Sequence, residues 1–176
     1  WHDGRPFTVD DIVYSYQRIM DPKVDAPHLR VYYQDIEKVE KIDRLTVRFT
    51  YRHPYFMALE FCGTIPIIPR HLFENGENFN SHRQNRAPVG IGPYSFVSWE
   101  TGKKIVLERN EDYWGRVIGR MPAIKRIRFE VVAEDAVALQ ILKKGELDFA
   151  GLRPIQWVRQ SDSERFARHF EKYRFY

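Results

Sequence analysis

The side chains best suited to chemistry are six histidines and one cysteine, and their spacing favours no catalytic site. The histidines are His2, His28, His53, His71, His82 and His169. No two of them stand at the i, i+4 spacing with which a helix presents two zinc ligands. Cys62 lies nine residues from both His53 and His71, but its apolar surroundings predict a buried, unreactive thiol. We therefore expect no catalytic residues, no metal site and no cofactor; a thiol or metal hydrolase that uses these residues is the weaker alternative.

A glycine pair and three aromatic residues are the remaining candidates for a binding site. Gly90-Ile91-Gly92-Pro93 looks like the start of a phosphate-binding loop, but no Gly-Lys-Ser/Thr follows it. We interpret it as a tight structural crossing, where glycine supplies backbone angles that other residues avoid. Tyr32, Tyr33 and Trp157 lie outside the clearest strand patterns and are candidates to line a cleft.

Composition predicts a globular chain with room for one compact domain or two small lobes. The 176 residues are 43% hydrophobic, 15% aromatic and 30% charged, which excludes a disordered polar chain, a collagen-like repeat and a disulfide-dense miniprotein. The longest apolar run, residues 55–59, is far shorter than the roughly 20 residues that span a bilayer. The chain begins at Trp1 without methionine, so we expect it to be an excerpt of a longer protein.

The net charge of +4 comes entirely from the second half of the chain. Its nearest approach to a basic stripe is Arg116, Arg120, Lys125, Arg126 and Arg128. The last two alternate with Ile127 and Phe129, a pattern typical of the solvated face of a strand. We therefore expect no nucleic-acid partner.

The first half predicts one helix and one hairpin. Thr8 is a good N-cap, and apolar residues recur at helical spacing from Val9 to Met20. Alternation across residues 36–51 around a polar Asp43-Arg44 turn predicts a β-hairpin. A short helix is expected near residues 54–61 and an extended crossing at 65–70, whereas residues 74–88 are polar and predict a loop or a lobe boundary.

The second half predicts a hairpin followed by a β-α-β unit. The hairpin strands are expected at residues 94–99 and 104–109, around a Glu100-Thr101-Gly102-Lys103 turn. The β-α-β unit is expected as a strand at 127–132, a helix at 135–144 and a strand at 147–150. Gly145 is placed as the glycine that ends the helix. The sequence thus predicts a mixed α/β protein.

Three ordered motifs resemble the family 5 extracellular solute-binding proteins, the oligopeptide- and dipeptide-binding subunits of bacterial ABC importers. Residues 1–15 are similar to that family's W-x-D/N-G-x-P-x-T-A-x-D-V-x-Y-S signature. Residues 88–99 and 107–114 are similar to its G-T-G-P-Y…W…L-E-R-N-x-x-Y-W stretch, with Ile91 where threonine is usual. Residues 138–148 match its A-L-x-x-L-x-x-G-E-x-D segment.

The resemblance implies an exported receptor, periplasmic or anchored at the cell surface, with a fold like the type II periplasmic binding proteins. Two lobes would close around a peptide, and the receptor would deliver it to a membrane permease. Residues 1–86 would then belong to an accessory lobe and residues 87–176 to part of the first ligand-binding lobe. Nickel, haem or an oligosaccharide is the alternative cargo on the same fold. The oligomeric state stays open.

The resemblance also suggests where the ligand is bound. The stretch after the first helix supplies an aromatic residue near the peptide, here Tyr32 or Tyr33, and the stretch after Gly145-Glu146-Leu147-Asp148 approaches the ligand. Arg153 is a candidate bidentate partner of a peptide carboxylate. The candidate ligand-binding residues are Tyr32, Tyr33, Phe149, Gly151, Arg153 and Trp157.

Overall fold

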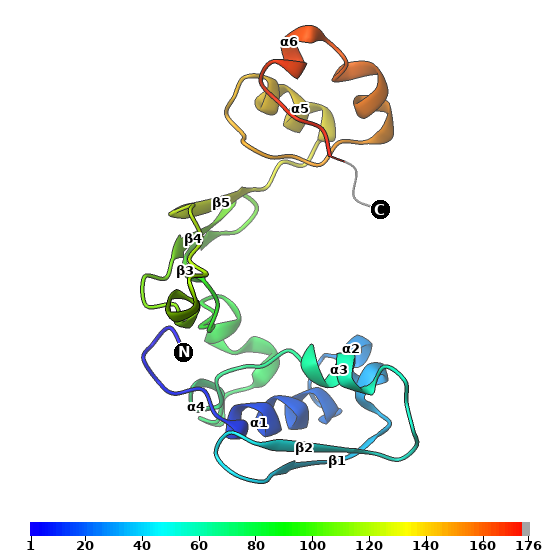
Figure 1. Ribbon diagram of the computed structural model, residues 1–176, viewed down its shortest axis with the longest axis vertical. Helices are drawn as coiled ribbons and strands as arrows, with labels where there is room; N and C mark the ends of the chain where they lie inside the picture. Colours follow the sequence, from blue (N-terminus) through cyan, green and yellow to red (C-terminus); the bar gives the residue numbers. More distant parts are fainter. Residues whose placement is uncertain (174–176) are drawn as a thin grey trace. The chain divides into compact units, whose positions relative to one another are not determined.

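The computed structural model of the protein describes residues 1–173 and has a mixed α/β architecture (Figure 1). The chain forms two compact units. Unit 1 comprises Trp1–Trp99 and Ile105–Arg128, and unit 2 comprises Glu100–Lys104 and the chain from Phe129 on. The boundaries of these units differ from those of the predicted lobes, 1–86 and 87–176. The lobes refer to a longer protein, so their boundaries stay a prediction.

The first part of unit 1 is a helical layer on one face of a β-hairpin (Figure 1). Helix α1 is Val9–Met20, as predicted, and strands β1 (Ile36–Lys41) and β2 (Val47–Tyr51) pair antiparallel, as predicted. The other helices are α2 (Pro27–Tyr33), α3 (Ala58–Gly63) and α4 (Arg70–Phe73). Ile19, Tyr33, Ile36 and Ile65 form the buried core between these elements.

The start of α1 is a buried polar junction that joins distant segments of unit 1. Asp11 Oδ2 accepts a hydrogen bond of 2.9 Å from Thr8 N, and Asp11 Oδ1 accepts one of 3.0 Å from Arg70 N. One turn later, Ser15 Oγ donates to Asp11 O and accepts from Ile68 N at 2.9 Å. The extended crossing at residues 65–70 is thereby fixed to α1, because its backbone N–H groups find their partners there.

The rest of unit 1 holds two short turns and most of a small sheet. The predicted loop at residues 74–88 contains the 3-10 turns η1 (Phe79–Ser81) and η2 (Arg83–Asn85). The sheet has the order β3-β4-β5, with β3 at Tyr94–Glu100, β4 at Lys104–Arg109 and β5 at Arg126–Glu130. The predicted second hairpin is confirmed by β3 and β4. A 3-10 turn, η3 (Trp114–Ile118), lies between β4 and β5.

The sequence predicted unusual backbone angles as the reason for glycine at positions 90 and 92, and this prediction is wrong. Gly90 and Gly92 have no positive φ, so unusual backbone angles do not explain them. Instead, the His2 ring lies against them: His2 Nε2 donates to Gly92 O at 2.9 Å, and Gly90 N donates to His2 Nδ1 at 3.3 Å. A Cβ on Gly90 would lie 3.3 Å from His2 Cε1. Close approach of the N-terminal segment is therefore the reason for glycine at position 90.

Unit 2 is built around helix α5 (Asp135–Lys143), which ends as predicted at Gly145. Gly145 has φ +78°, and Gly145 N and Glu146 N donate to Leu142 O and Ile141 O. This is the Schellman pattern of a helix C-terminus. The α6 helix (Glu164–Ala167) follows later in the unit.

The expected strand at residues 147–150 is wrong. In the described part of the chain, these residues pair with no other strand, and the sheet ends at β5. Leu147 and Ala150 pack instead on a cluster formed by Leu139, Leu142 and Phe166. Leu147 and Ala150 are only partly buried, and Phe149 between them is exposed. A strand also needs a hydrogen-bonded neighbour, which these residues lack.

Among the described residues, no helix is both long enough and apolar enough to cross a membrane.

Candidate ligand-binding site

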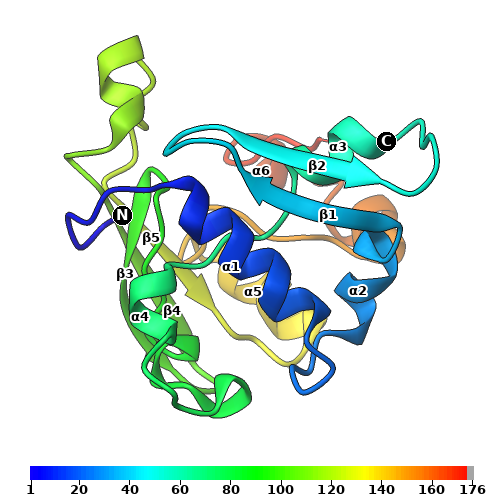
Figure 2. The same cartoon turned by 90° about the horizontal axis from the view of Figure 1, so that it is seen from below.

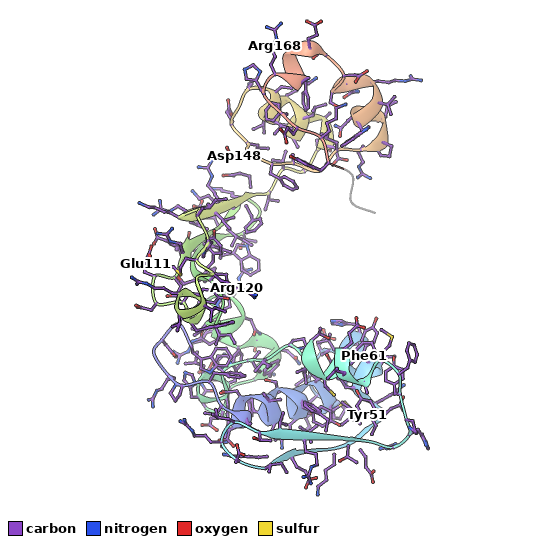
Figure 3. The ribbon with its side chains drawn as sticks, viewed as in Figure 1. Tyr51, Phe61, Glu111, Arg120, Asp148 and Arg168 are labelled. Atoms are coloured by element: carbon purple, nitrogen blue, oxygen red, sulfur yellow. The ribbon has the colours of Figure 1, made fainter. Side chains whose placement is uncertain are left out.

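A pocket of about 600 Å³ lies beside α5 in unit 2. Three predicted site residues, Phe149, Gly151 and Trp157, line it. Leu142 and Phe166, from the buried cluster of the unit, form an apolar wall. Phe149 is 77% exposed, so its ring stands at the surface and is available to a bound molecule. Asp148, labelled in Figure 3, directly precedes Phe149 in the segment that follows α5.

The segment that carries Trp157 is held to the start of α5 by a buried glutamine. Gln156 Nε2 donates to Asp135 O at 2.8 Å, and Gln156 Oε1 accepts from Arg153 N at 3.0 Å. Gln156 also begins the π-helical turn η4 (Gln156–Gln160). Turns of this kind are uncommon and are frequent at functional sites. The glutamine therefore fixes the segment that presents the indole of Trp157 to the pocket.

Arg153 lies beside this segment but is not among the residues that line the pocket. Its Nε donates to Asp135 Oδ2 at 2.5 Å, and both side chains are more than half exposed. A peptide carboxylate would have to compete with Asp135 for this guanidinium. The predicted role of Arg153 stays a prediction.

Charged groups of both signs surround the apolar wall. Lys172 Nζ donates to Trp157 O at 3.0 Å, lies 5.1 Å from the centre of the Trp157 ring and is 3.7 Å from Asp162 Oδ1. Tyr173 Oη donates to a carboxylate oxygen of Glu171, and this hydrogen bond raises the pKa of Tyr173. A dipolar ligand with an apolar body would find both kinds of partner here.

Tyr32 and Tyr33, at the end of α2 in unit 1, have different environments. Tyr33 is only 3% exposed and belongs to the core, where its ring meets Phe61 edge to face at 6.4 Å. Tyr32 is about half exposed and stacks on Phe61 at 5.2 Å. Phe61, on α3, and Tyr51, on β2, are labelled in Figure 3. Of the two tyrosines, Tyr32 is the one whose ring a ligand can reach, and both assignments remain predictions.

His82 and Cys62 take structural positions, whereas His169 is exposed and lines the pocket. His82 is buried, with Nδ1 accepting from Gln84 N at 3.2 Å and its ring 4.5 Å from that of Phe73. Cys62 is half-buried, and its Sγ lies 3.7 Å from Tyr51 Oη. Burial and this contact with the thiol raise the pKa of Tyr51. Within residues 1–173, no three His, Cys, Asp or Glu side chains gather as metal ligands.

Sequence reasoning missed the contribution of the last described segment to the pocket. Phe166, Phe170 and Lys172 all line it. Phe166 and Phe170 stand four residues apart, with ring centres 4.9 Å apart. That i, i+4 aromatic spacing is the signal that predicts a shared apolar face.

The chain belongs to the bacterial extracellular solute-binding proteins, family 5, whose profile ("Bacterial extracellular solute-binding proteins, family 5 Middle") matches residues 1–174. The resemblance seen in the sequence motifs is thereby confirmed.

Individual relatives agree with this membership. NikZ from Campylobacter jejuni, solved with Ni(L-His), is 30% identical with a TM-score of 0.81 over 93% of this chain and 32% of its own. A periplasmic oligopeptide-binding protein from Thermotoga maritima is 31% identical with a TM-score of 0.72 over 88% of this chain and 29% of its own. YejA of Agrobacterium fabrum, which is named for peptide binding, is 30% identical over 85% of this chain and 25% of its own. The chain thus spans about a quarter to a third of the length of these relatives.

Proposed function

We propose that this chain is part of the substrate-binding component of an ABC importer that captures peptides and delivers them to a membrane permease. The observation that carries the proposal is the pocket beside α5, with the exposed ring of Phe149 and the indole of Trp157 on an apolar wall inside a family 5 chain. The protein would act outside the cytoplasm, as a binding protein and not as an enzyme. Residues 1–86 and 87–176 would belong to its accessory lobe and first ligand-binding lobe.

The pocket suits a peptide because it combines apolar surface with charges of both signs. A short peptide has a positive amino terminus, a negative carboxyl terminus and side chains of mixed polarity. Receptors of this type take affinity from backbone hydrogen bonds and terminal charges, while side chains fill roomy spaces. Asp148, Glu171 and Lys172 supply both signs at the pocket. Arg153 and Tyr32 do not line this pocket and stay separate predicted ligand contacts of the longer receptor.

A metal chelate is the second candidate cargo, because NikZ was solved with Ni(L-His). A bare nickel ion is disfavoured within residues 1–173, where no three potential ligands come together. A nickel complex that brings its own ligands needs fewer protein ligands, so the test below includes it.

The test is the thermal unfolding of the full-length receptor that contains this chain, with a panel of potential cargoes. A ligand that binds only the native state raises the melting temperature by mass action. We expect di- to pentapeptides to raise it, and nickel with L-histidine, haem and mannose oligosaccharides to leave it unchanged. A rise with one of these alone, and none with peptides, would contradict the proposal and assign the other cargo.

A further inference from the structure

The connection between β4 and β5 presents apolar side chains directly to solvent. We call residues 113–125 the β4–β5 protrusion; it contains η3 and extends away from the strands of unit 1 as a yellow-green coil in Figure 2. Val117 is 90% exposed, Trp114 59% and Ile118 57%. Three neighbouring apolar side chains at one projecting turn are more than the scattered surface apolar residues that need no explanation.

Backbone hydrogen bonds give the protrusion a defined conformation. Gly119 N donates to Arg116 O at 3.1 Å, and Arg120 N donates to Gly115 O at 2.8 Å, so the turn closes on itself. Gly119 has φ +71°, which favours glycine. At Gly115 a Cβ would lie 2.2 Å from Tyr113 Cε1, so only glycine fits beneath that ring.

The base of the protrusion is anchored to β3 and β4. Arg109 Nη1 donates to Pro122 O at 3.0 Å, and Tyr94 Oη donates to Ile124 O at 2.9 Å. Arg109 also holds Glu111, with its Nε and Nη2 at 2.9 and 2.7 Å from Glu111 Oε1. Anchoring of this kind keeps the apolar tip exposed, because the turn cannot fold back to bury it.

The charged side chains of the protrusion itself are all basic. From Tyr113 to Arg128 the chain has five basic residues and no acidic one. Arg116, Arg120 and Lys125 are exposed on the protrusion itself. Glu111 and Asp112 precede it at the base, where Arg109 compensates the charge of Glu111. Figure 3 labels Glu111 and Arg120 on this connection.

We propose that the β4–β5 protrusion binds the surface of an anionic lipid bilayer, with Trp114, Val117 and Ile118 entering the interface and Arg116, Arg120 and Lys125 meeting the headgroups. Tryptophan favours the membrane–water interface, and a short apolar tip with basic flanks is typical of proteins that lie on membranes. Each cation near an anionic surface strengthens binding about fivefold, so three contribute on the order of a hundredfold. The proposal does not depend on the identity of the cargo.

The test is cosedimentation of the full-length receptor with vesicles of phosphatidylcholine alone or mixed with phosphatidylglycerol. We expect binding to the mixed vesicles that weakens with added salt, and none to phosphatidylcholine alone, because the attraction is screened. Val117→Ser/Ile118→Ser should weaken binding about tenfold. Arg120→Gln/Lys125→Gln should weaken it about twentyfold and reduce its salt dependence.

The matched control lies on the β1–β2 turn, where Leu45 is 71% exposed next to Arg44. Arg44→Gln/Leu45→Ser should bind like the unchanged receptor. All substituted side chains are exposed, so melting temperatures should not change. No binding to the mixed vesicles at low salt, or equal loss in the control, would overturn the proposal. If the receptor does not bind the vesicles and the protrusion variants fail to stimulate a reconstituted permease, the membrane proposal is overturned. The protrusion would then bind an acidic protein partner.

Discussion

Units 1 and 2 of the chain are held together in different ways. In unit 1, polar side chains join segments far apart in the sequence: Asp11 to Arg70, Ser15 to Ile68 and His2 to Gly92. In unit 2, the connecting hydrogen bonds are shorter in range, such as Gln156 to Asp135, and the buried cluster is Leu139, Leu142 and Phe166 beside a pocket. Unit 1 therefore resembles a stable scaffold, whereas unit 2 keeps apolar surface available for a ligand.

The largest expected effect comes from Leu139→Ala in the buried cluster of unit 2. Leu139 is 1% exposed, so the substitution leaves a cavity that costs about 3 kcal/mol of stability. Hydrogen exchange of the full-length receptor should show faster opening of α5, with the amides of β1 and β2 unchanged. Ile19→Ala is the matched substitution in unit 1. It should speed the exchange of the β1 and β2 amides and leave the amides of α5 unchanged. Equal effects of both variants on both units would remove the distinction between them.

Asp11→Ala should break the polar junction of unit 1 at a cost of about 2 kcal/mol. The backbone N–H groups of Thr8 and Arg70 would lose their acceptor, and unpaired buried donors are costly. Asp10→Ala is the control, because Asp10 pairs with Lys41 at the surface and should cost less than about 1 kcal/mol. Chemical denaturation measures both. Similar losses of stability for Asp11→Ala and Asp10→Ala would contradict the stabilising role of the buried polar junction.

Gly145→Ala should destabilise the end of α5 by about 1 kcal/mol, since its φ of +78° is unfavourable for a residue with a Cβ. Gly63→Ala is the control in unit 1, because Gly63 has no positive φ and a Cβ there would meet open space. Exchange of the last amides of α5 is the readout. Unchanged exchange would contradict the assignment of Gly145 as the helix terminator.

The smallest effect concerns pH and the contact between Asp3 and His71 in unit 1. Partial burial pushes the pKa of Asp3 up, but hydrogen bonds from His71 Nε2 and Arg5 N outweigh it and hold that pKa below its usual value of 3.8. The folded state therefore gains stability above about pH 4 and loses it as the pH falls through the lowered pKa. Asp3→Asn should flatten the acid limb of a stability curve by less than about 1 kcal/mol. An identical acid limb in both proteins would show that the contact is negligible.

Local patterns were enough to predict much of the fold. The Thr8 cap, the alternation on both sides of Asp43 and the terminating role of Gly145 each depend on residues close in sequence, and the structure confirms the elements they predict. Helix α2 was missed, although Pro27 at its first position was an available signal. The expected strand at 147–150 failed because strand formation depends on a distant partner.

The candidate site was less predictable, because its parts meet only after folding. Phe149 and Gly151 were identified through resemblance to a family, and Trp157 from its place outside the clearest strand patterns. All three line one pocket. Phe166, Phe170 and Lys172 lie in a segment without a clear motif and were missed. The burial of Tyr33 beneath its exposed neighbour Tyr32 depends on the position of α3, which the two tyrosines alone do not specify.

The most direct test of the account is calorimetric titration of the full-length receptor, and of its Phe149→Ala variant, with a peptide that raises the melting temperature. Phe56→Ala is the control, because Phe56 is equally a surface phenylalanine but lies before α3 in unit 1. We expect peptide affinity to be about tenfold weaker for Phe149→Ala, because the variant loses the aromatic contact with the bound peptide, and unchanged for Phe56→Ala. Full affinity in the Phe149 variant would contradict a ligand site at the pocket beside α5.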